Sequence, residues 1–279
     1  MENHLLNKNK KSPTLVGIPT KSGQFEDKHY MIGSAPIFID KKSEVGALLL
    51  HSYTSTPYEM KEIASYLADK GITVYAPLIA GHGTTPDDLA KTTIAEWQES
   101  AEKAYFFIKE KVRKVFVIGS SFGGNLAFHL ATKFNNPLAG VISMGTPIKV
   151  QWQKAFLAAM YTYGFFKKNQ KKRRRDYHFT FEDIDQVVYP VMPVKSLRRL
   201  FYFFRKVTPS SLPKITAPTL IIQSSQEKIV NPDSAQYIHE KLASKNKRIL
   251  WMNGSTHALT IAEKRNLIFN TVYHFISEN

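Results

Sequence analysis

A serine flanked by glycines stands between two predicted elements of different type. Gly119-Ser120-Ser121-Phe122-Gly123 fits the pattern G-x-S-x-G, with the apolar strand KVFVIG before it and a helical pattern after it. A serine on such a sharp turn has a strained backbone, and the small glycines avoid clashes between helix and strand. Its hydroxyl lies clear of the sheet at a helix N-terminus, whose dipole favours developing negative charge. The motif predicts Ser121 as a nucleophile, and a plain strand-to-helix turn is the alternative.

A serine nucleophile needs a base, and the base needs a group that orients it. In the usual order for this motif, the acid and then the histidine follow later strands. His257 follows the predicted strand RILWM near the C-terminus and is the predicted base, with a surface histidine at a helix start as the alternative. Glu227 follows the predicted strand PTLIIQ and is the favoured acid. Asp233 is the alternative acid, although the helix dipole alone explains a carboxylate in a first helical turn.

Acyl transfer also needs hydrogen-bond donors for the negative charge that develops on the carbonyl oxygen. The backbone N–H of Phe122, directly after the predicted nucleophile, is one expected donor. The second is expected from the loop His51-Ser52-Tyr53-Thr54, where the N–H of Tyr53 is favoured. An ordinary strand-to-helix loop is the alternative interpretation of that residue.

The elements that must position these residues alternate between strands and helices. Strands are predicted at residues 46–51, 72–76, 114–119, 139–144, 218–223 and 248–252, and helices at 57–70, 94–112, from 122, from 231 and at 258–276. Thr56 and Pro57 suit the N-cap and first position of one helix, and Gly71 suits its end. Continuously apolar strands that alternate with helices predict an α/β fold, with a mostly parallel sheet covered on both faces.

The alternation breaks between residues 147 and 213, a segment we call the insert. It is aromatic, reads as helical, and holds 14 Lys and Arg against four acids, so it carries +10 of the net charge of +15. We expect it to form a separate basic lid. Seven of the nine residues from Lys167 to Arg175 are basic. A solvated surface is one interpretation of this run, and docking to an anionic membrane beside the apolar stretch 155–166 is the second. Nucleic-acid binding is the third.

Length and composition limit the remaining possibilities. The chain has 279 residues, 43% apolar and 22% charged, which suits one sizeable domain with an insertion or two modest domains. The absence of cysteine excludes disulfides, thiolate zinc sites and cysteine nucleophiles. No nucleic-acid motif is visible, so no nucleic-acid partner is expected. We expect a flexible leader at 1–28, a core at 29–146 and 214–279, and a cytoplasmic monomer or homodimer.

Several separated segments carry a family resemblance: LLLHSYTS, YAPLIAGHG, GSSFGG, APTLIIQSSQEKIVNPDSA and NGSTHALT. From Gly46 to the C-terminus the chain resembles the small bacterial carboxylesterases of the monoacylglycerol-lipase-like group within the α/β-hydrolases. The resemblance implies an α/β-hydrolase fold with a helical lid. It also implies hydrolysis of short- to medium-chain acyl esters, including monoacylglycerols, through an acyl-serine intermediate without a cofactor or metal.

Two positions depart from the family pattern. The family usually has His-Gly where this chain has His51-Ser52, and Asp where it has Glu227. A side chain at position 52 can narrow the predicted donor loop or alter its backbone geometry. The extra methylene of the glutamate changes the distance over which its carboxylate reaches His257. The alternatives are a thioesterase or acyltransferase with the same triad, or a ligand-binding homologue with weak turnover.

Overall fold

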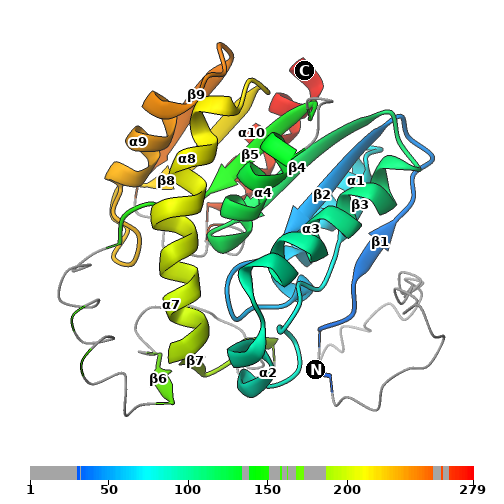
Figure 1. Ribbon diagram of the computed structural model, residues 1–279. Coiled ribbons are helices and arrows are strands. Elements are labelled where there is room, and N and C mark those ends of the chain that lie inside the picture. The colour runs from blue at the N-terminus through cyan, green and yellow to red at the C-terminus, as the bar shows by residue number, and fades with distance from the viewer. Residues whose placement is uncertain are drawn as a thin grey trace, which may run out of the picture.

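A seven-stranded sheet forms the centre of the molecule (Figure 1). The computed structural model describes residues 30–31, 33–133, 138–150, 158, 162, 168–172, 187–253, 259 and 264–279. The sheet order is β1-β3-β2-β4-β5-β8-β9. Its strands are β1 (Ile37–Ile39), β2 (Val45–Leu50), β3 (Thr73–Ala76), β4 (Lys114–Ser120), β5 (Gly140–Met144), β8 (Thr219–Ser224) and β9 (Lys247–Met252). Only β1 runs antiparallel to its neighbour, so the predicted mostly parallel sheet is confirmed.

The central strands are apolar along their whole length because helices cover both faces of the sheet. In β2, Leu48 pairs with Val117 of β4 and belongs to the core on one face. The next residue pair, Leu49 and Ile118, belongs to the core on the other face. The edge strand β9 differs, since Trp251 exposes 43% of its surface.

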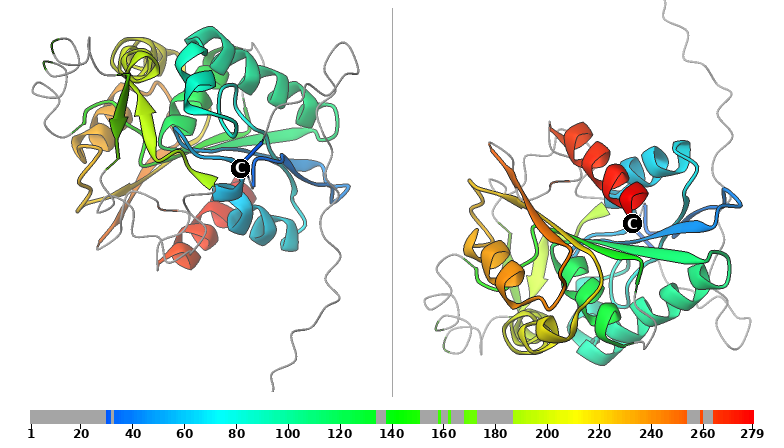
Figure 2. Two further views of the ribbon diagram at one scale, coloured as in Figure 1. Left: turned by 90° about the horizontal axis from the view of Figure 1, so that it is seen from below. Right: turned by 90° about the horizontal axis from the view of Figure 1, so that it is seen from above.

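Helices form a layer on each side of this sheet (Figure 2). One layer contains α3 (Ile94–Lys109), α4 (Phe122–Lys133) and α9 (Asp233–Lys241), and the other contains α1 (Lys61–Asp69) and α10 (Arg265–Glu278). No helix in the described part of the chain is long and apolar enough to cross a membrane.

The helix predicted at 57–70 consists of two elements. A 3-10 helix η1 (Pro57–Met60) leads into α1. Thr56 precedes it as predicted, but its side chain makes no capping hydrogen bond, and its buried hydroxyl has no partner among the described residues. Thr56 therefore has the predicted N-cap position, but its side chain does not cap the helix. The physical reason is the tight turn, in which the N–H of Glu59 binds the backbone carbonyl of Thr56 at 3.1 Å instead.

Other boundaries shift for local reasons. Gly71 ends α1 with φ +84°, as predicted for a glycine after a helix. The closing helix, predicted from residue 258, begins only at Arg265 among the described residues, after the non-helical backbone of Lys264.

The sequence prediction lacked β1 and also α2 (Pro86–Lys91). The signals for α2 were present: Pro86 at its first position, after Thr85, whose hydroxyl accepts a hydrogen bond from the N–H of Asp88 at 3.2 Å.

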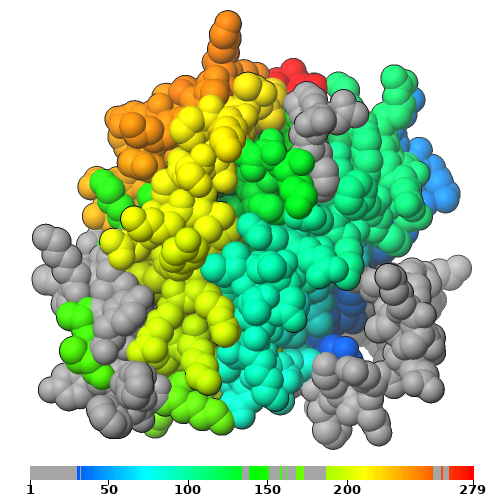
Figure 3. Space-filling model, in the orientation of Figure 1, coloured from blue at the N-terminus to red at the C-terminus, as the bar shows by residue number. Residues whose placement is uncertain are grey.

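The sequence predicted a helical insert. The structure differs, because two of the insert's described segments form a small antiparallel sheet. Its described elements are β6 (Asn169–Lys171), β7 (Val191–Pro193), α7 (Val194–Tyr202), a π-helical turn (Phe203–Val207) and α8 (Thr208–Ser211). Figure 3 shows the α7–α8 segment on one face of the molecule, where α7 packs against α2 and α8 packs against α4. Residues 173–175, and 155–166 apart from 158 and 162, lie outside the described residues, as does the predicted leader.

Candidate active site

Ser121 occupies a strained turn between β4 and α4. Its φ is +51°, a left-handed conformation that costs a non-glycine residue roughly 1–2 kcal/mol. The backbone holds this conformation in place, because the N–H of Ser121 donates to the carbonyl of Met144 at 2.7 Å and its carbonyl accepts from the N–H of Gly124 at 3.0 Å. The turn therefore has the strain that the motif predicts.

The glycines of the motif are required by close backbone packing. A Cβ added to Gly119 would lie 2.2 Å from the carbonyl carbon of Gly123. A Cβ on Gly123 would lie 2.1 Å from the carbonyl oxygen of Leu50, at the end of β2. The serine turn is thus pressed directly against the start of the next loop of the site.

That next loop, residues 51–54, is held by side chains. The backbone N–H and the hydroxyl of Ser52 both donate to one carboxylate oxygen of Glu59, at 2.9 and 2.6 Å. Position 52, where the family usually has glycine, therefore gains an anchor on η1. Thr54, at the other end, has φ +67°.

Two unused backbone donors lie close to the serine turn. Among the described residues, neither the N–H of Tyr53 nor that of Phe122 donates a hydrogen bond. The side chains of these two residues meet edge to face, with ring centroids 6.1 Å apart. The structure thus brings together three of the five predicted site residues, and unused backbone donors of this kind can bind an anion.

Two buried histidines line the same loop. His51 accepts a hydrogen bond on Nε2 from the N–H of Ile79 (3.2 Å), so its Nδ1 carries the proton and donates to the carbonyl of Ser52 (2.9 Å). Burial lowers the pKa of His51. Burial, together with the repulsion that a protonated His51 would exert, lowers the pKa of His82 well below its usual value. Both rings are therefore neutral, and His82 stacks on Phe122 as part of the site's apolar wall.

The two candidate acids have different surroundings. Glu227 lies just beyond the C-terminal end of β8, is only 6% exposed, and accepts a hydrogen bond from the N–H of Ile229 at 2.7 Å. Asp233 is exposed and is the first residue of α9. The N–H of Asp233 donates to the side chain of Asn231 at 2.9 Å. Burial favours Glu227 as the acid, whereas Asp233 has the position of a helix-end charge.

His257 lies within residues 254–258, outside the described residues. The strand before it is described, and it brings the two late loops side by side. The N–H of Ser225, after β8, donates to the carbonyl of Met252 at 3.0 Å, and its hydroxyl donates to the side chain of Asn253 at 2.9 Å. The segment that leads to His257 therefore starts beside the loop of Glu227.

The insert contacts the 51–54 loop through residues that the sequence did not single out. The hydroxyl of Tyr53 shares a hydrogen bond of 2.5 Å with Ser196 of α7, and the N–H of Tyr189 donates to the carbonyl of Thr54 at 2.9 Å. Glu59 was missed as well. Its signal, an acid in a first helical turn, is explained by the dipole alone, and no local pattern links Ser196 to a loop 143 residues away.

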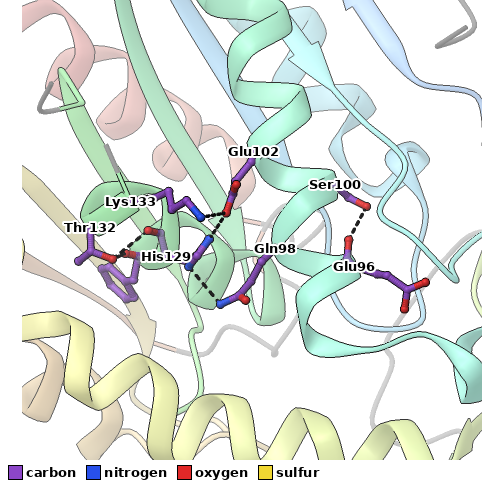
Figure 4. A network of polar contacts seen from close by, with 8 residues as sticks. Glu96, Gln98, Ser100, Glu102, His129, Thr132 and Lys133 are labelled. Carbon is purple, nitrogen blue, oxygen red and sulfur yellow. Dashed lines mark hydrogen bonds and ion pairs between the residues drawn. The ribbon is translucent and has the colours of Figure 1, made fainter. Parts of the chain in front are cut away.

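A polar network fixes α4, the helix that begins at the serine turn, to α3 (Figure 4). Glu102 Oε1 contacts His129 Nε2 at 2.7 Å and Lys133 Nζ at 3.2 Å, and Gln98 pairs with His129 Nδ1 at 3.1 Å. Burial acts to raise the pKa of Glu102, but the hydrogen bonds from His129 and Lys133 outweigh it and lower that pKa. This network is a mechanical support and lies apart from the loops of the site.

The described residues include no group of three or more His, Cys, Asp or Glu side chains that could hold a metal ion. The backbone N–H groups of Tyr53 and Phe122 suit an anionic oxygen.

Comparison with known proteins agrees with this geometry. A family model described as serine aminopeptidase, S33, matches residues 43–265. A thermostable monoacylglycerol lipase from Bacillus sp. (strain H-257) is 27% identical over 91% of this chain and 98% of its own length. A carboxylesterase from Bacillus subtilis (strain 168) is 25% identical over 86% of this chain and 96% of its own.

A solved structure of metagenome-derived lipolytic enzymes, LipS and LipT, gives a TM-score of 0.82. It is 27% identical and covers 90% of this chain and 100% of the other. The predicted fold, family resemblance and enzyme class, carboxylic-ester hydrolase, are confirmed by these similarities. The chain belongs to the serine aminopeptidase S33 family of α/β-hydrolases.

Proposed function

We propose that the chain is a serine carboxylesterase that hydrolyses short- to medium-chain acyl esters, including monoacylglycerols. Ser121 acts as nucleophile, His257 as base and Glu227 as the acid that orients it. The N–H groups of Tyr53 and Phe122 bind the oxyanion. One observation carries the proposal: a serine at φ +51° stands beside two backbone N–H groups with no partner in the described part of the chain.

The reaction proceeds in two halves. His257 takes the hydroxyl proton as the oxygen of Ser121 forms a bond to the ester carbonyl carbon. The carbonyl oxygen becomes negative between the N–H groups of Tyr53 and Phe122. The bond to the alcohol then breaks, and the alcohol leaves with the proton from His257. Water attacks the acyl-serine by the same steps and releases the carboxylic acid.

Glu227 is the better acid for this reaction because it is buried at a strand end. A buried carboxylate stabilises an imidazolium more strongly than an exposed one, since less water screens it. Its contact with the N–H of Ile229 fixes the carboxylate's orientation. Asp233 is exposed on α9, where water screens its charge.

The substrate class is supported by the relatives and by the aromatic rings beside the serine turn. The two curated relatives are named monoacylglycerol lipase and carboxylesterase. On this chain, the rings of Tyr53, Trp97, Phe122 and Phe203 pack around the site. Apolar rings beside two polar donors suit an acyl chain joined to an ester carbonyl. Cytoplasmic location, oligomeric state and membrane docking by the basic run remain predictions from the sequence.

The first test is a panel of chromogenic esters and acyl thioesters of increasing chain length. Ser121→Ala should lower kcat by about 10⁴-fold or more, as loss of a serine nucleophile does elsewhere. A product burst in the wild type would show that the serine is acylated. Equally slow hydrolysis by wild type and variant would overturn the proposal, and faster turnover of thioesters would reassign the substrate.

A second pair of variants decides the acid. Glu227→Gln should lower kcat by orders of magnitude, whereas Asp233→Asn should change it by less than about twofold. The two changes remove the same charge from neighbouring segments, so each controls for the other. A large loss in Asp233→Asn with little in Glu227→Gln would exchange the two roles.

A further inference from the structure

A lysine from the insert reaches the 51–54 loop. Lys172 follows β6, and its backbone N–H donates to the carbonyl of Pro190 at 3.2 Å, which fixes it to the small sheet of the insert. Its Nζ donates to the hydroxyl oxygen of Thr54. Lysine heads normally remain in water, but this side chain is mostly buried.

The contact continues to the residue that we propose as an oxyanion donor. The hydroxyl of Thr54 donates to the carbonyl oxygen of Tyr53 at 2.5 Å. A chain of hydrogen bonds therefore runs from Lys172 through Thr54 to the backbone of Tyr53. The other end of Tyr53 is held by Ser196. Tyr53 is thus fixed at both its main chain and its side chain by residues of the insert.

Among the described residues, the charged and titratable groups around this lysine come from three segments: η1, the loop after β2 and the loop after β3. Glu59 faces it from η1 and favours its charged form. His82, from the loop after β3, has a pKa that the charge of Lys172 helps to lower. His51 lies beside His82, with ring centroids 5.1 Å apart. Burial lowers the pKa of Lys172 to about 7, against the pull of Glu59. The lysine therefore exchanges its proton close to neutral pH.

We propose that Lys172 is a positioning residue for ester hydrolysis, which holds Tyr53 through Thr54 and adds positive charge beside the oxyanion. The inference rests on the proposed function. A positive charge in a poorly solvated site stabilises negative charge more than it would in water. A neutral amine still donates a hydrogen bond to Thr54 but supplies no charge. As the pH rises, Lys172 therefore loses its positive charge but keeps its hydrogen bond to Thr54.

The experiment measures kcat and KM from about pH 5.5 to 9.5 for the wild type, Lys172→Met, Lys172→Arg and Lys171→Met. Protonation of the catalytic histidine affects all four proteins alike, so it cancels in their ratios. The wild-type to Lys172→Met ratio of kcat should be about tenfold near pH 6 and fall to about threefold near pH 9.5, with KM little changed. Lys171→Met removes an exposed neighbouring charge and should match the wild type throughout.

Arginine supplies a charge that does not titrate in this range. Activity of the wild type relative to Lys172→Arg should therefore also fall as the pH rises, whatever the constant cost of the larger side chain. A flat ratio for both variants, or a Lys172→Met profile equal to that of Lys171→Met, would overturn the proposal.

A measurement on the wild type covers the case in which Lys172→Met does not fold. NMR of protein with isotope-labelled lysines should show one side-chain resonance with a midpoint near pH 7 that is absent from Lys172→Arg. No lysine titrating between about pH 6 and 8 would overturn the inference. Full activity of Ser121→Ala would instead refute the proposed function, whatever Lys172 does.

Discussion

The serine turn and the 51–54 loop meet in one site but are held in place by different means. The turn is fixed by main-chain packing, since a single added carbon at Gly123 would collide with the carbonyl oxygen of Leu50. The 51–54 loop is fixed by side chains, from Glu59 on η1 and from Ser196 and Lys172 in the insert. The first arrangement tolerates almost no change, whereas the second can be adjusted one contact at a time.

The largest effect is expected in the serine turn at Gly123, where no space exists for an added Cβ. Gly123→Ala should destabilise the protein by about 3 kcal/mol or more and abolish ester hydrolysis, because backbone atoms must move. Urea unfolding and kcat would measure both losses. Gly71→Ala is the contrasting control: its φ is positive, at +84°, which that of Gly123 is not, but nothing lies within 4 Å of an added Cβ. It should cost only about 1–2 kcal/mol of backbone strain and leave kcat unchanged. An equal loss of stability in the two variants would show that close backbone packing at Gly123 does not fix the serine turn.

An intermediate effect is expected in the 51–54 loop. Glu59→Ala removes the acceptor of two Ser52 hydrogen bonds, each to a charged group and worth about 1.5–3 kcal/mol, and should lower kcat about tenfold. Ser52→Gly loses only the hydroxyl, keeps the backbone N–H on Glu59, and should stay within about threefold of the wild type. Glu62→Ala, which breaks an ion pair with Arg265 on the surface, is the control. A loop that works equally well without Glu59 would contradict the side-chain account.

The smallest effect on activity is expected in the network of Figure 4. The pKa of Glu102 is lowered in the folded state, so its stabilising contribution is present above its ordinary pKa and is lost as the pH falls through the lowered value. Glu102→Gln should therefore lower the melting temperature at neutral pH, through roughly 0.5–1 kcal/mol, and converge with the wild type in acid. Ester hydrolysis should not change. A difference in stability that grows as the pH falls would show that the pKa shift has the opposite sign.

The comparison also explains what the sequence could predict. The serine turn depends on residues within five positions of each other, so the pattern around Ser121 reveals both the turn and its neighbouring strand and helix. The parallel strands follow from uninterrupted apolar runs. By contrast, Glu59, Ser196 and Lys172 act on a loop that is distant in the chain, and their positions become visible only in three dimensions. The short edge strand β1 was missed because three half-buried residues give no clear period.

The contacts of Tyr189 have a consequence for protein engineering. Its N–H holds Thr54, while its hydroxyl donates to the carbonyl of Gly81 at 3.1 Å and accepts from the N–H of Thr84 at 2.8 Å. One insert residue thus joins two loops of the core. The segment 147–213 therefore cannot be exchanged independently of the core loops that it contacts. A chimera that borrows this segment from a relative to change acyl preference must also carry matched partners for residues 53, 54 and 81–84, or it will lose turnover before its selectivity can be measured.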